Sequence, residues 1–261
     1  MKRFENKKYY FYIIIAIILF GGIIYYQNSR IVHITDEDIA LSGSPYVTPQ
    51  LFGAVGDGVA NDSKAIQAAI DYASNSQYNV VFIPKGVYSV RNLKLKKNVS
   101  LLGEGEESIL LASPTCKTWD GILHCNNVSD FSIKNIVFDG NKPIVEGNDH
   151  KGVVNIWIKE ATNFQIENCT FQNNWYAGVS IKNSSKILVS NNRFINLDCG
   201  VITTDKPSND ITITDNYFDG AEMSDPISIY ALAEGYHNNV TITNNIIKNN
   251  ADSMAADFIF I

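Results

Sequence analysis

An eight-residue pattern of apolar and polar positions recurs five times in the second half of the chain. Positions one and three are apolar in every copy, and position eight is Phe in four copies and Ile in the fifth. This alternation predicts a strand with one buried face. Position five is always Asn or Asp. The five copies are Phe131–Phe138, Phe164–Phe171, Ile187–Phe194, Ile211–Phe218 and Val240–Ile247.

The spacing of these copies favours an all-β solenoid. Successive copies begin 33, 23, 24 and 29 residues apart, with no helical pattern between them. One unit cannot bury its apolar side chains alone, so units are expected to stack at about 4.8 Å. Position five should turn the chain, because Asn and Asp tolerate the left-handed backbone region. The Asn side-chain amides of successive units should then stack and hydrogen-bond to one another. We therefore predict a parallel β-helix. Unrelated hairpins in a sandwich, the alternative, would not keep one residue type at one offset.

The N-terminal region predicts a membrane anchor. Residues 1–8 contain four basic side chains, and residues 9–26 form an uncharged run of 18 residues. As a helix this run would be about 27 Å long, enough to span a bilayer. The basic flank predicts a cytoplasmic N-terminus and an extracellular C-terminal domain. A cleaved signal peptide and a secreted domain are the alternative, although no small-x-small site follows the run. We expect a basic tail at 1–8, a transmembrane signal-anchor at 9–26, a stalk at 27–50 and the β-helix domain at 51–261.

A capping helix is predicted where the repeat region begins. Asn61 or Asp62 would be its N-cap. Its apolar positions recur with the helical period, at Ala65, Ile66, Ala69, Ile70 and Ala73. Such a helix is expected to cover the open apolar end of the first coil.

Composition and net charge narrow the classes of molecule that the chain is expected to bind. A formal net charge of −6 and a pI near 5.2 argue against a nucleic-acid or anionic-lipid binder. The four cysteines fit no metal-ligand spacing. Cys169 lies inside a repeat and is expected to be a buried thiol, whereas Cys116 and Cys125 could close a short disulfide loop in an exported protein.

Three segments of the N-terminal half resemble the entry region of the pectate-lyase-like superfamily. They are Phe52–Gly58 with Ala65–Ile70, then Val80–Tyr88, then Val99–Gly105. The branch with this region includes polygalacturonases, rhamnogalacturonases, some phage tailspikes and mannuronan epimerases. The resemblance covers about residues 50 to 250. It implies a right-handed parallel β-helix and a carbohydrate-handling role.

Further strands are predicted between the repeats, and they carry the candidate site. These strands are Gly152–Ile158, Gly178–Ile181, Gly200–Thr203 and Pro226–Ile229. Their solvent-facing positions should form two columns, one of Trp157, Ser180, Ile202 and Ser228 and one of Lys159, Lys182, Thr204 and Tyr230. The loops that enter them supply Asp149, His150, Lys151, Trp175, Tyr176, Asp198 and Asp225. The resemblance implies that this sheet and its loops form a sugar groove.

Two kinds of chemistry fit these residues. Asp198 and Asp225 enter consecutive copies of the sheet, so they could be acid and base of a hydrolase, with repulsion raising one pKa. Alternatively Lys182 could take the proton next to a uronate carboxylate while aspartates hold Ca²⁺, which is lyase chemistry. The expected substrate-binding residues are His150, Lys151, Trp157, Trp175, Tyr176 and Tyr230.

The sequence departs from the resembled family at its catalytic motifs. The polygalacturonase motifs Asn-Thr-Asp, Asp-Asp, Gly-His-Gly and Arg-Ile-Lys are absent, and Ile227 follows Asp225-Pro226 where the epimerases have His. Two hypotheses therefore remain: an enzyme acting on acidic polysaccharide, or a non-catalytic glycan-binding or surface-structural β-helix. The apolar segment 255–261 predicts a terminal strand, either of a truncated relative or of a chain capped by another.

Overall fold

The computed structural model describes residues 18–19, 22–23, 34–36, 45–117, 120–142, 153–203, 206–220, 225–230, 235–248 and 259–260. The chain divides into a unit at Met1–His33 and a unit at Ile34–Ile261. In the first unit, β1 (Ile18–Leu19) pairs antiparallel with β2 (Gly22–Ile23). These four residues are strands where a helix was predicted, because isoleucine favours strands and glycine is a poor helix former. The rest of the predicted anchor lies outside the described residues. No helix in the described part of the chain is long and apolar enough to span a membrane.

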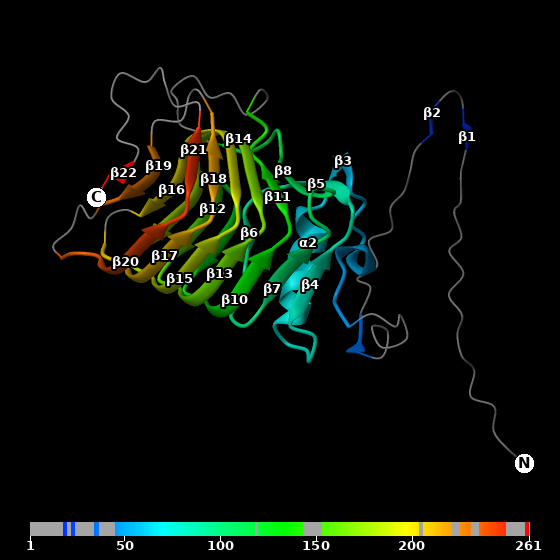
Figure 1. Ribbon diagram of the computed structural model, residues 1–261. Helices are drawn as coiled ribbons and strands as arrows, with labels where there is room; N and C mark the ends of the chain where they lie inside the picture. The colour runs from blue at the N-terminus through cyan, green and yellow to red at the C-terminus, as the bar shows by residue number, and fades with distance from the viewer. Residues whose placement is uncertain are drawn as a thin grey trace, which may run out of the picture. The chain divides into compact units, whose positions relative to one another are not determined.

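The second unit is a parallel β-helix whose coils contribute strands to three sheets (Figure 1). The first sheet contains β4 (Val80–Ile83), β7 (Ser100–Gly103), β10 (Ser129–Lys134), β13 (Thr162–Glu167), β15 (Ser185–Ser190), β17 (Asn209–Thr214) and β20 (Asn238–Thr243). The second contains β3 (Asp57–Asn61), β5 (Gly86–Val90), β8 (Ser108–Ala112), β11 (Val137–Asp139), the first parts of β14 (Thr170–Lys182) and β16 (Arg193–Thr203), β18 (Tyr217–Asp219) and β21 (Ile246–Lys248). The third sheet contains β6 (Leu93–Lys94), β9 (Gly121–Asn126), β12 (Val154–Lys159), the last parts of β14 and β16, β19 (Asp225–Ile229) and β22 (Ile259–Phe260). The terminal strand predicted within 255–261 is therefore present as β22, paired in parallel with β19.

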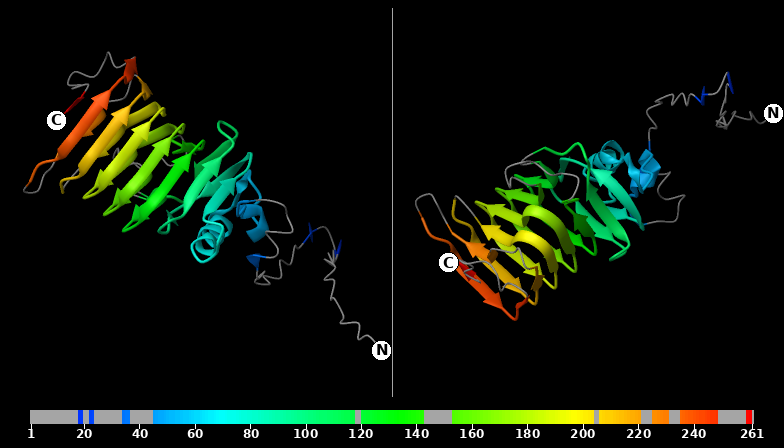
Figure 2. Two further views of the ribbon diagram at one scale, coloured as in Figure 1. Left: turned by 60° about the horizontal axis from the view of Figure 1, so that its bottom comes forward. Right: turned by 90° about the horizontal axis from the view of Figure 1, so that it is seen from above.

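The five sequence copies stack in register, as predicted. Position one aligns Phe131, Phe164, Ile187, Ile211 and Val240 across parallel strands of the first sheet. Position eight aligns Phe138, Phe171, Phe194, Phe218 and Ile247 in the second sheet. The rings in this second column stack at centroid distances of 5.3, 4.9 and 4.7 Å. Both views in Figure 2 show the strands of successive coils lying side by side.

The corner between the first and second sheets confirms one prediction and corrects another. Position five adopts the left-handed backbone in all five copies, with φ between 53° and 57° at Asn135, Asn168, Asn191, Asp215 and Asn244. The hydrogen-bonded amide column, however, is formed at position six. Asn192 and Asn216 are each 1% exposed. Position five faces outward because the turn places its side chain outside the coil, and the next residue points into the core.

Asn216 shows how this amide column works. Its side-chain oxygen accepts hydrogen bonds from the backbone N and the Nδ2 of Asn192, at 2.9 and 3.1 Å. Its own Nδ2 donates to the Val189 carbonyl at 2.9 Å and to the Asn245 Oδ1 at 3.0 Å. Each buried amide thus satisfies backbone groups of the preceding coil that the tight turn leaves without strand partners.

We expect Asn216→Ala to lower the free energy of unfolding by about 3 kcal/mol, because it leaves several buried donors and acceptors without partners. Urea unfolding followed by circular dichroism measures the change. The matched control is Asn191→Gly, at the exposed neighbouring position with φ 56°. Because glycine tolerates this φ, the control should cost about 0.5 kcal/mol or less. Equal losses in the two variants would contradict the role of the amide column.

An N-terminal helix packs next to the first coils, as predicted. Helix α2 (Ser63–Ala73) buries the five predicted Ala and Ile side chains, and it contacts β4, β5, β6 and the 3₁₀ helix η1 (Pro49–Phe52). Asp62 is the N-cap residue, but its side chain does not cap the helix. The Asp62 carboxylate accepts hydrogen bonds from the backbone N of Val55 and of Gly56, at 2.7 and 3.1 Å. It therefore fixes the glycine-rich loop, whereas Asn61 Oδ1 accepts from the backbone N of Ser63 at 3.0 Å.

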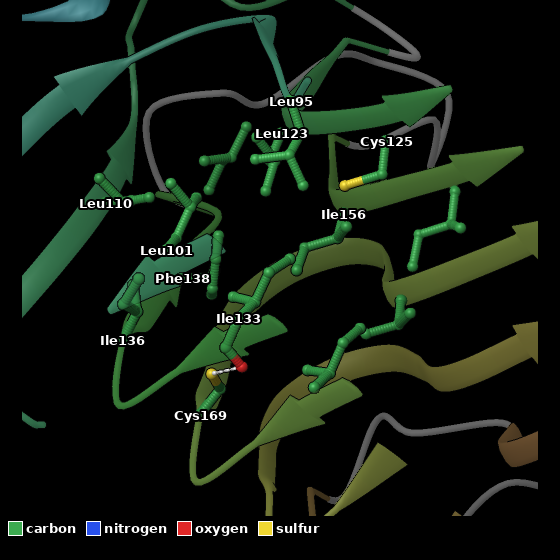
Figure 3. Packing of buried hydrophobic residues seen from close by; sticks show 14 of the residues in the cluster. Leu95, Leu101, Leu110, Leu123, Cys125, Ile133, Ile136, Phe138, Ile156 and Cys169 are labelled. Carbon is green, nitrogen blue, oxygen red and sulfur yellow. Dashed lines mark hydrogen bonds between the residues drawn. The ribbon is translucent and has the colours of Figure 1, made fainter. Parts of the chain in front are cut away.

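The core lies between the three sheets, and its thiols are buried. Figure 3 shows Cys125 and Cys169 among Leu, Ile and Phe side chains. The Sγ of Cys169 lies 3.5 Å from the Ile133 carbonyl oxygen, and burial raises the pKa of this thiol to about 12. The buried thiol predicted there is confirmed. Cys116 and Cys125 are free thiols rather than a disulfide.

Candidate functional site

The candidate site lies on the outward face of the third sheet. Parallel pairing aligns His124, Trp157, Ser180, Ile202 and Ser228 in one outward column. A second outward column aligns Asn126, Lys159 and Lys182. The predicted alignment is confirmed for the first column and for Lys159 and Lys182 in the second. Thr204 lies outside the described residues, and the backbone N of Tyr230 donates to the Thr203 carbonyl at 3.2 Å.

Solvent exposure of the first column was predicted wrongly. Ser180, Ile202 and Ser228 are only 1 to 3% exposed, and Trp157 is half-buried. The reason is a second, smaller apolar cluster on the outward face of the sheet. It consists of Val154, Ala177, Cys199 and Ile202, with Trp157 and Tyr176 packed against it. Part of the expected groove is therefore filled by side chains of the protein itself.

A buried amide network positions the two aromatic residues predicted to bind sugar. The pairing of β14 with β16 is irregular between Asn174 and Ala177, where Trp175 and Tyr176 occur. Asn174 is 1% exposed, and its Nδ2 donates to the Asn155 Oδ1 at 2.7 Å and to the Ala177 carbonyl at 3.1 Å. Its Oδ1 accepts from the Tyr176 backbone N at 3.2 Å. The network holds this irregularity in place and so sets where both rings leave the strand.

Trp175 and Tyr176 have different surroundings. The Nε1 of Trp175 donates to the Lys142 carbonyl at 3.1 Å, and the Lys142 Nζ lies 3.8 Å from the centre of its ring. Tyr176 is half-buried and packs against the outward apolar cluster. Both rings thus remain partly accessible at the margin of the third sheet where the strands begin. A partly exposed, fixed ring is suited to stack on a sugar.

The structure brings the two predicted catalytic aspartates close together in the sheet. Asp225 is level with Cys199 on the neighbouring strand, so Asp198 precedes that level by one residue. Asp198 is half-buried, and its Oδ2 lies 3.9 Å from the Cys199 Sγ. The backbones of the two aspartates therefore lie on neighbouring strands, at the margin of the third sheet where these strands begin.

Lys182 does not join this pair. It follows Ala177 by five residues, and Ala177 is level with Cys199 and therefore with Asp225. At roughly 3.3 Å per strand residue, the Lys182 backbone lies about 16 Å along the strand from that level. The aspartates occur where strands of the third sheet begin, and Lys182 occurs where a strand ends.

Lys182 instead belongs to a basic hollow at the opposite margin. Lys159, Glu160, Lys182, Asn183 and Lys206 line this hollow, which has a volume of about 200 Å³. The Nζ of Lys182 also lies 5.5 Å from the centre of the Trp157 ring. Trp157 was predicted to bind substrate, and its position next to Lys182 places it between the basic margin and the outward apolar cluster.

His124 is a residue of this face that sequence reasoning missed. Its Nε2 lies 3.0 Å from the Asn92 Oδ1, so the neutral ring donates this hydrogen bond. Burial lowers the pKa of His124, with Lys94 acting in the same direction and Asp120 opposing it. His124 is therefore neutral at pH 7. The sequence contains little signal for His124, because β9 lies outside the five sequence copies. Only strand alternation, which places His124 on the same face as Asn126, could have indicated it.

Two predicted substrate-binding residues, His150 and Lys151, lie outside the described residues. Within the described part of the chain, no three His, Cys, Asp or Glu side chains gather as metal ligands would.

The stacked parallel sheets define a parallel β-helix, with charged and aromatic side chains on the outward face of its third sheet. The chain belongs to the rhamnogalacturonase A/epimerase, pectate lyase-like family, whose model matches residues 50–255. The resemblance read from the glycine-rich entry segments is thereby confirmed.

Similar proteins include a lyase and a plasmin and fibronectin-binding protein. Alginate lyase 7 from Azotobacter vinelandii is 36% identical over 109 residues, which cover 37% of this chain and 13% of the relative. Plasmin and fibronectin-binding protein A from Streptococcus pneumoniae is 28% identical over 190 residues, which cover 64% of this chain and 26% of the relative. The chain therefore spans about a quarter or less of these relatives. A putative glycosyl hydrolase from Parabacteroides merdae superposes with a TM-score of 0.64 at 20% identity, over 78% of this chain and 98% of that one, and shares the fold.

Proposed function

We propose that this chain is a membrane-anchored extracellular protein that processes an acidic polysaccharide on the outward face of its third sheet, as a glycoside hydrolase or a lyase. One observation carries the proposal: the sheet has two neighbouring aspartate positions at one margin and a group of lysines at the other. The family and the similarity to alginate lyase 7 support a polysaccharide substrate.

The hydrolase version assigns the reaction to the aspartates. One carboxyl is the general acid that protonates the leaving-group oxygen of the glycosidic bond. The other carboxylate either activates water or attacks the sugar, and the distance between the two carboxyls decides between inversion and retention. Trp175 and Tyr176 would hold a sugar ring near this pair.

The lyase version assigns proton abstraction to Lys182. In this role the Lys182 amine is the general base that takes the proton next to the uronate carboxylate. The aspartates expected to hold Ca²⁺ are at the other margin, so Lys159 and Lys206 would neutralise the uronate carboxylate beside Lys182. Because Lys182 is about 16 Å along the strand from the aspartate level, the lyase and hydrolase versions place the reaction at opposite margins of the sheet.

A panel of defined polysaccharides tests the proposal. The purified chain is incubated with polygalacturonate, alginate and acetylated and neutral glycans, and new reducing ends are counted while ultraviolet absorbance is recorded. Reducing ends without absorbance indicate a hydrolase, and absorbance from a new carbon–carbon double bond indicates a lyase. Intact polymers throughout the panel would overturn the enzymatic proposal.

The membrane anchor is part of the proposal and has its own test. The basic tail at 1–8 and the uncharged run at 9–26 support it. Full-length chain should sediment with membranes and be cleaved by protease added outside the cell. Recovery of a shortened chain in the medium would support the secreted alternative.

The separation of Lys182 from the aspartates also favours a second candidate, a non-catalytic glycan-binding surface protein. The similarity to plasmin and fibronectin-binding protein A agrees with a surface role. This candidate predicts retention of glycans on arrays without turnover. Trp175→Ala should weaken retention about tenfold, since stacking on a sugar is worth about 1 kcal/mol or more. The control is Tyr236→Ala, which removes another aromatic side chain. Tyr236 precedes β20 and is 87% exposed, and its removal should leave glycan retention unchanged.

A further inference from the structure

The outward face of the second sheet is apolar over much of its length. One outward column begins with Val87, Ile109 and Val137 on β5, β8 and β11 (Figure 1). The same column ends with Tyr217 and Ile246 on β18 and β21. In the first sheet, by contrast, the described outward positions from β10 to β20 are all polar apart from one leucine, Leu188.

Strand β8 shows the pattern at the level of single residues. Leu110 is 0% exposed and points into the core, whereas its neighbours Ile109 and Leu111 point outward and are half-buried. An uninterrupted apolar run of this kind is typical of a strand that is covered on both faces. The main contacts of β8 are with its sheet neighbours β5 and β11 and with β9 of the third sheet. These strands form the wall of the β-helix, and none of them lies over the outward side of β8.

The two margins of this face carry opposite charge. The margin where β5 and β8 begin has an excess of carboxylates, with the exposed side chains of Glu104, Glu106 and Glu107 against Lys85. The margin where the same strands end has an excess of cations, with Arg91 and Lys117 against Asp120. Ion pairs within each margin, such as Arg91 Nε to Asp120 Oδ2 at 3.7 Å, lie at the surface and are weak.

We propose that two copies of this chain associate through the outward faces of their second sheets, about a two-fold axis parallel to the coil stack. The two sheets would pack about 10 Å apart, and their strands would run in opposite directions across the contact. Ile109 of one copy would then face Leu111 of the other, and the acidic margin of each copy would face the basic margin of its mate. The proposal does not rest on the enzymatic function, because the third sheet takes no part in the contact.

A second copy is the occupant that this face fits best. The face is self-complementary in charge, because a half-turn about the stack axis exchanges its two margins. Tyr217 and Arg193, whose guanidinium carbon lies 5.9 Å from the tyrosine ring centre, are residue types that interfaces favour. The arrangement also keeps the N-terminal coils of both copies at the same end, as two copies anchored in one membrane would require.

The size of the face indicates a reversible dimer. Its seven strands, β5 to β21, extend over about 29 Å at the ordinary strand spacing. A contact of this length and two outward columns is at the small end of specific interfaces, where association is weak and depends on concentration. Anchoring in one membrane would raise the local concentration of the two copies and favour pairing.

Sedimentation velocity of the full chain in a density-matched neutral detergent measures the association over a wide range of protein concentration. Ile109→Lys places a charge within the face, and Ile109→Thr removes the apolar side chain but keeps a β-branched residue. The matched control is Leu188→Lys, at a half-buried outward position on β15 of the first sheet. Circular dichroism checks that each variant is folded.

Wild type should pass reversibly from monomer to dimer as its concentration rises. Each substitution occurs twice in a two-fold contact and therefore acts twice. Ile109→Lys should weaken dimerisation about 100-fold or more and Ile109→Thr about tenfold, since both lose apolar contact and the lysine also places a charge in the contact. Leu188→Lys should match wild type.

A charge exchange tests the orientation of the two copies. Glu106→Lys should weaken dimerisation, and adding Lys117→Glu to the same chain should recover most of it, because the two margins face each other. A monomer at every concentration, an association that survives Ile109→Lys, an equal loss in Leu188→Lys, or assemblies larger than a dimer would overturn the contact. A loss in Glu106→Lys that Lys117→Glu does not recover would overturn the two-fold axis proposed here. None of these outcomes depends on turnover of a polysaccharide.

Discussion

Phe194→Ala is expected to lower the free energy of unfolding by about 3 to 5 kcal/mol, the usual cost of removing a fully buried phenyl ring. Phe194 is 0% exposed and stands inside the aromatic column, 4.9 Å from the Phe171 ring centre and 4.7 Å from that of Phe218. The cavity would lie between two stacked rings. Neither ring can move to fill it, because each is held at the coil spacing by its own strand. Thermal and urea unfolding measure the loss.

Two variants of the same region serve as controls. Phe194→Leu keeps most of the volume and should cost about 1.5 kcal/mol. Ile195→Ala changes the next residue of β16, whose side chain is only half-buried, and should cost about 1 kcal/mol. If Phe194→Ala were no worse than Ile195→Ala, the column would not support the coils as described.

The stacking of the coils could be predicted from the sequence because it follows from side-chain period alone. Apolar residues at positions one, three and eight have only one way to be buried when every unit is too short to fold by itself. Phe138, Phe171, Phe194 and Phe218 then have to lie one above the other. The left-handed turn at position five could be predicted for a similar reason, since few residues tolerate it.

The amide column could not be assigned to its position from the sequence. Positions five and six are both Asn at 191–192 and 244–245, so residue type does not show which amide points inward. The backbone rotation at the corner decides it, and that rotation depends on hydrogen bonds to the neighbouring coils. Ile136 and Cys169, at position six of their copies, were the signs in the sequence that this position is buried.

The sequence predicted which residues of the candidate site align in columns. It did not predict which of them are exposed or which lie close together. Alternation along each strand placed Trp157, Ser180 and Ile202 on one face. Ser180 and Ile202 are nevertheless buried, and Ile202 packs with Ala177 and Cys199 on the outward face. The period of one strand cannot indicate such packing between strands. Lys182 was grouped with Asp198 because both border the same sheet. The parallel register shows that they border it at opposite margins.

Asp225→Asn is expected to reduce turnover of the polysaccharide identified by the panel by about 10² to 10⁴-fold, and Asp198→Asn by a similar factor, if the two carboxylates share acid and base roles. Asparagine keeps the size of the side chain and cannot exchange a proton. On the neighbouring strands, Cys199 and Ala177 are the residues in register with Asp225. No other described carboxylate is therefore in register to replace it. The measurement is kcat on the long polymer, with binding recorded in parallel.

The matched control is Asp219→Asn, on β18 of the second sheet, where the Asp219 Oδ2 accepts a hydrogen bond from the Tyr217 hydroxyl at 2.7 Å. It changes the charge equally and should leave turnover intact. A pair acting as one unit is strongly non-additive, so the double variant should be little slower than the slower single variant. Unchanged turnover in both single variants would exclude the aspartate margin. A loss in Lys182→Gln alone, larger than its loss of binding, would then move the reaction to the lysine margin and select the lyase version.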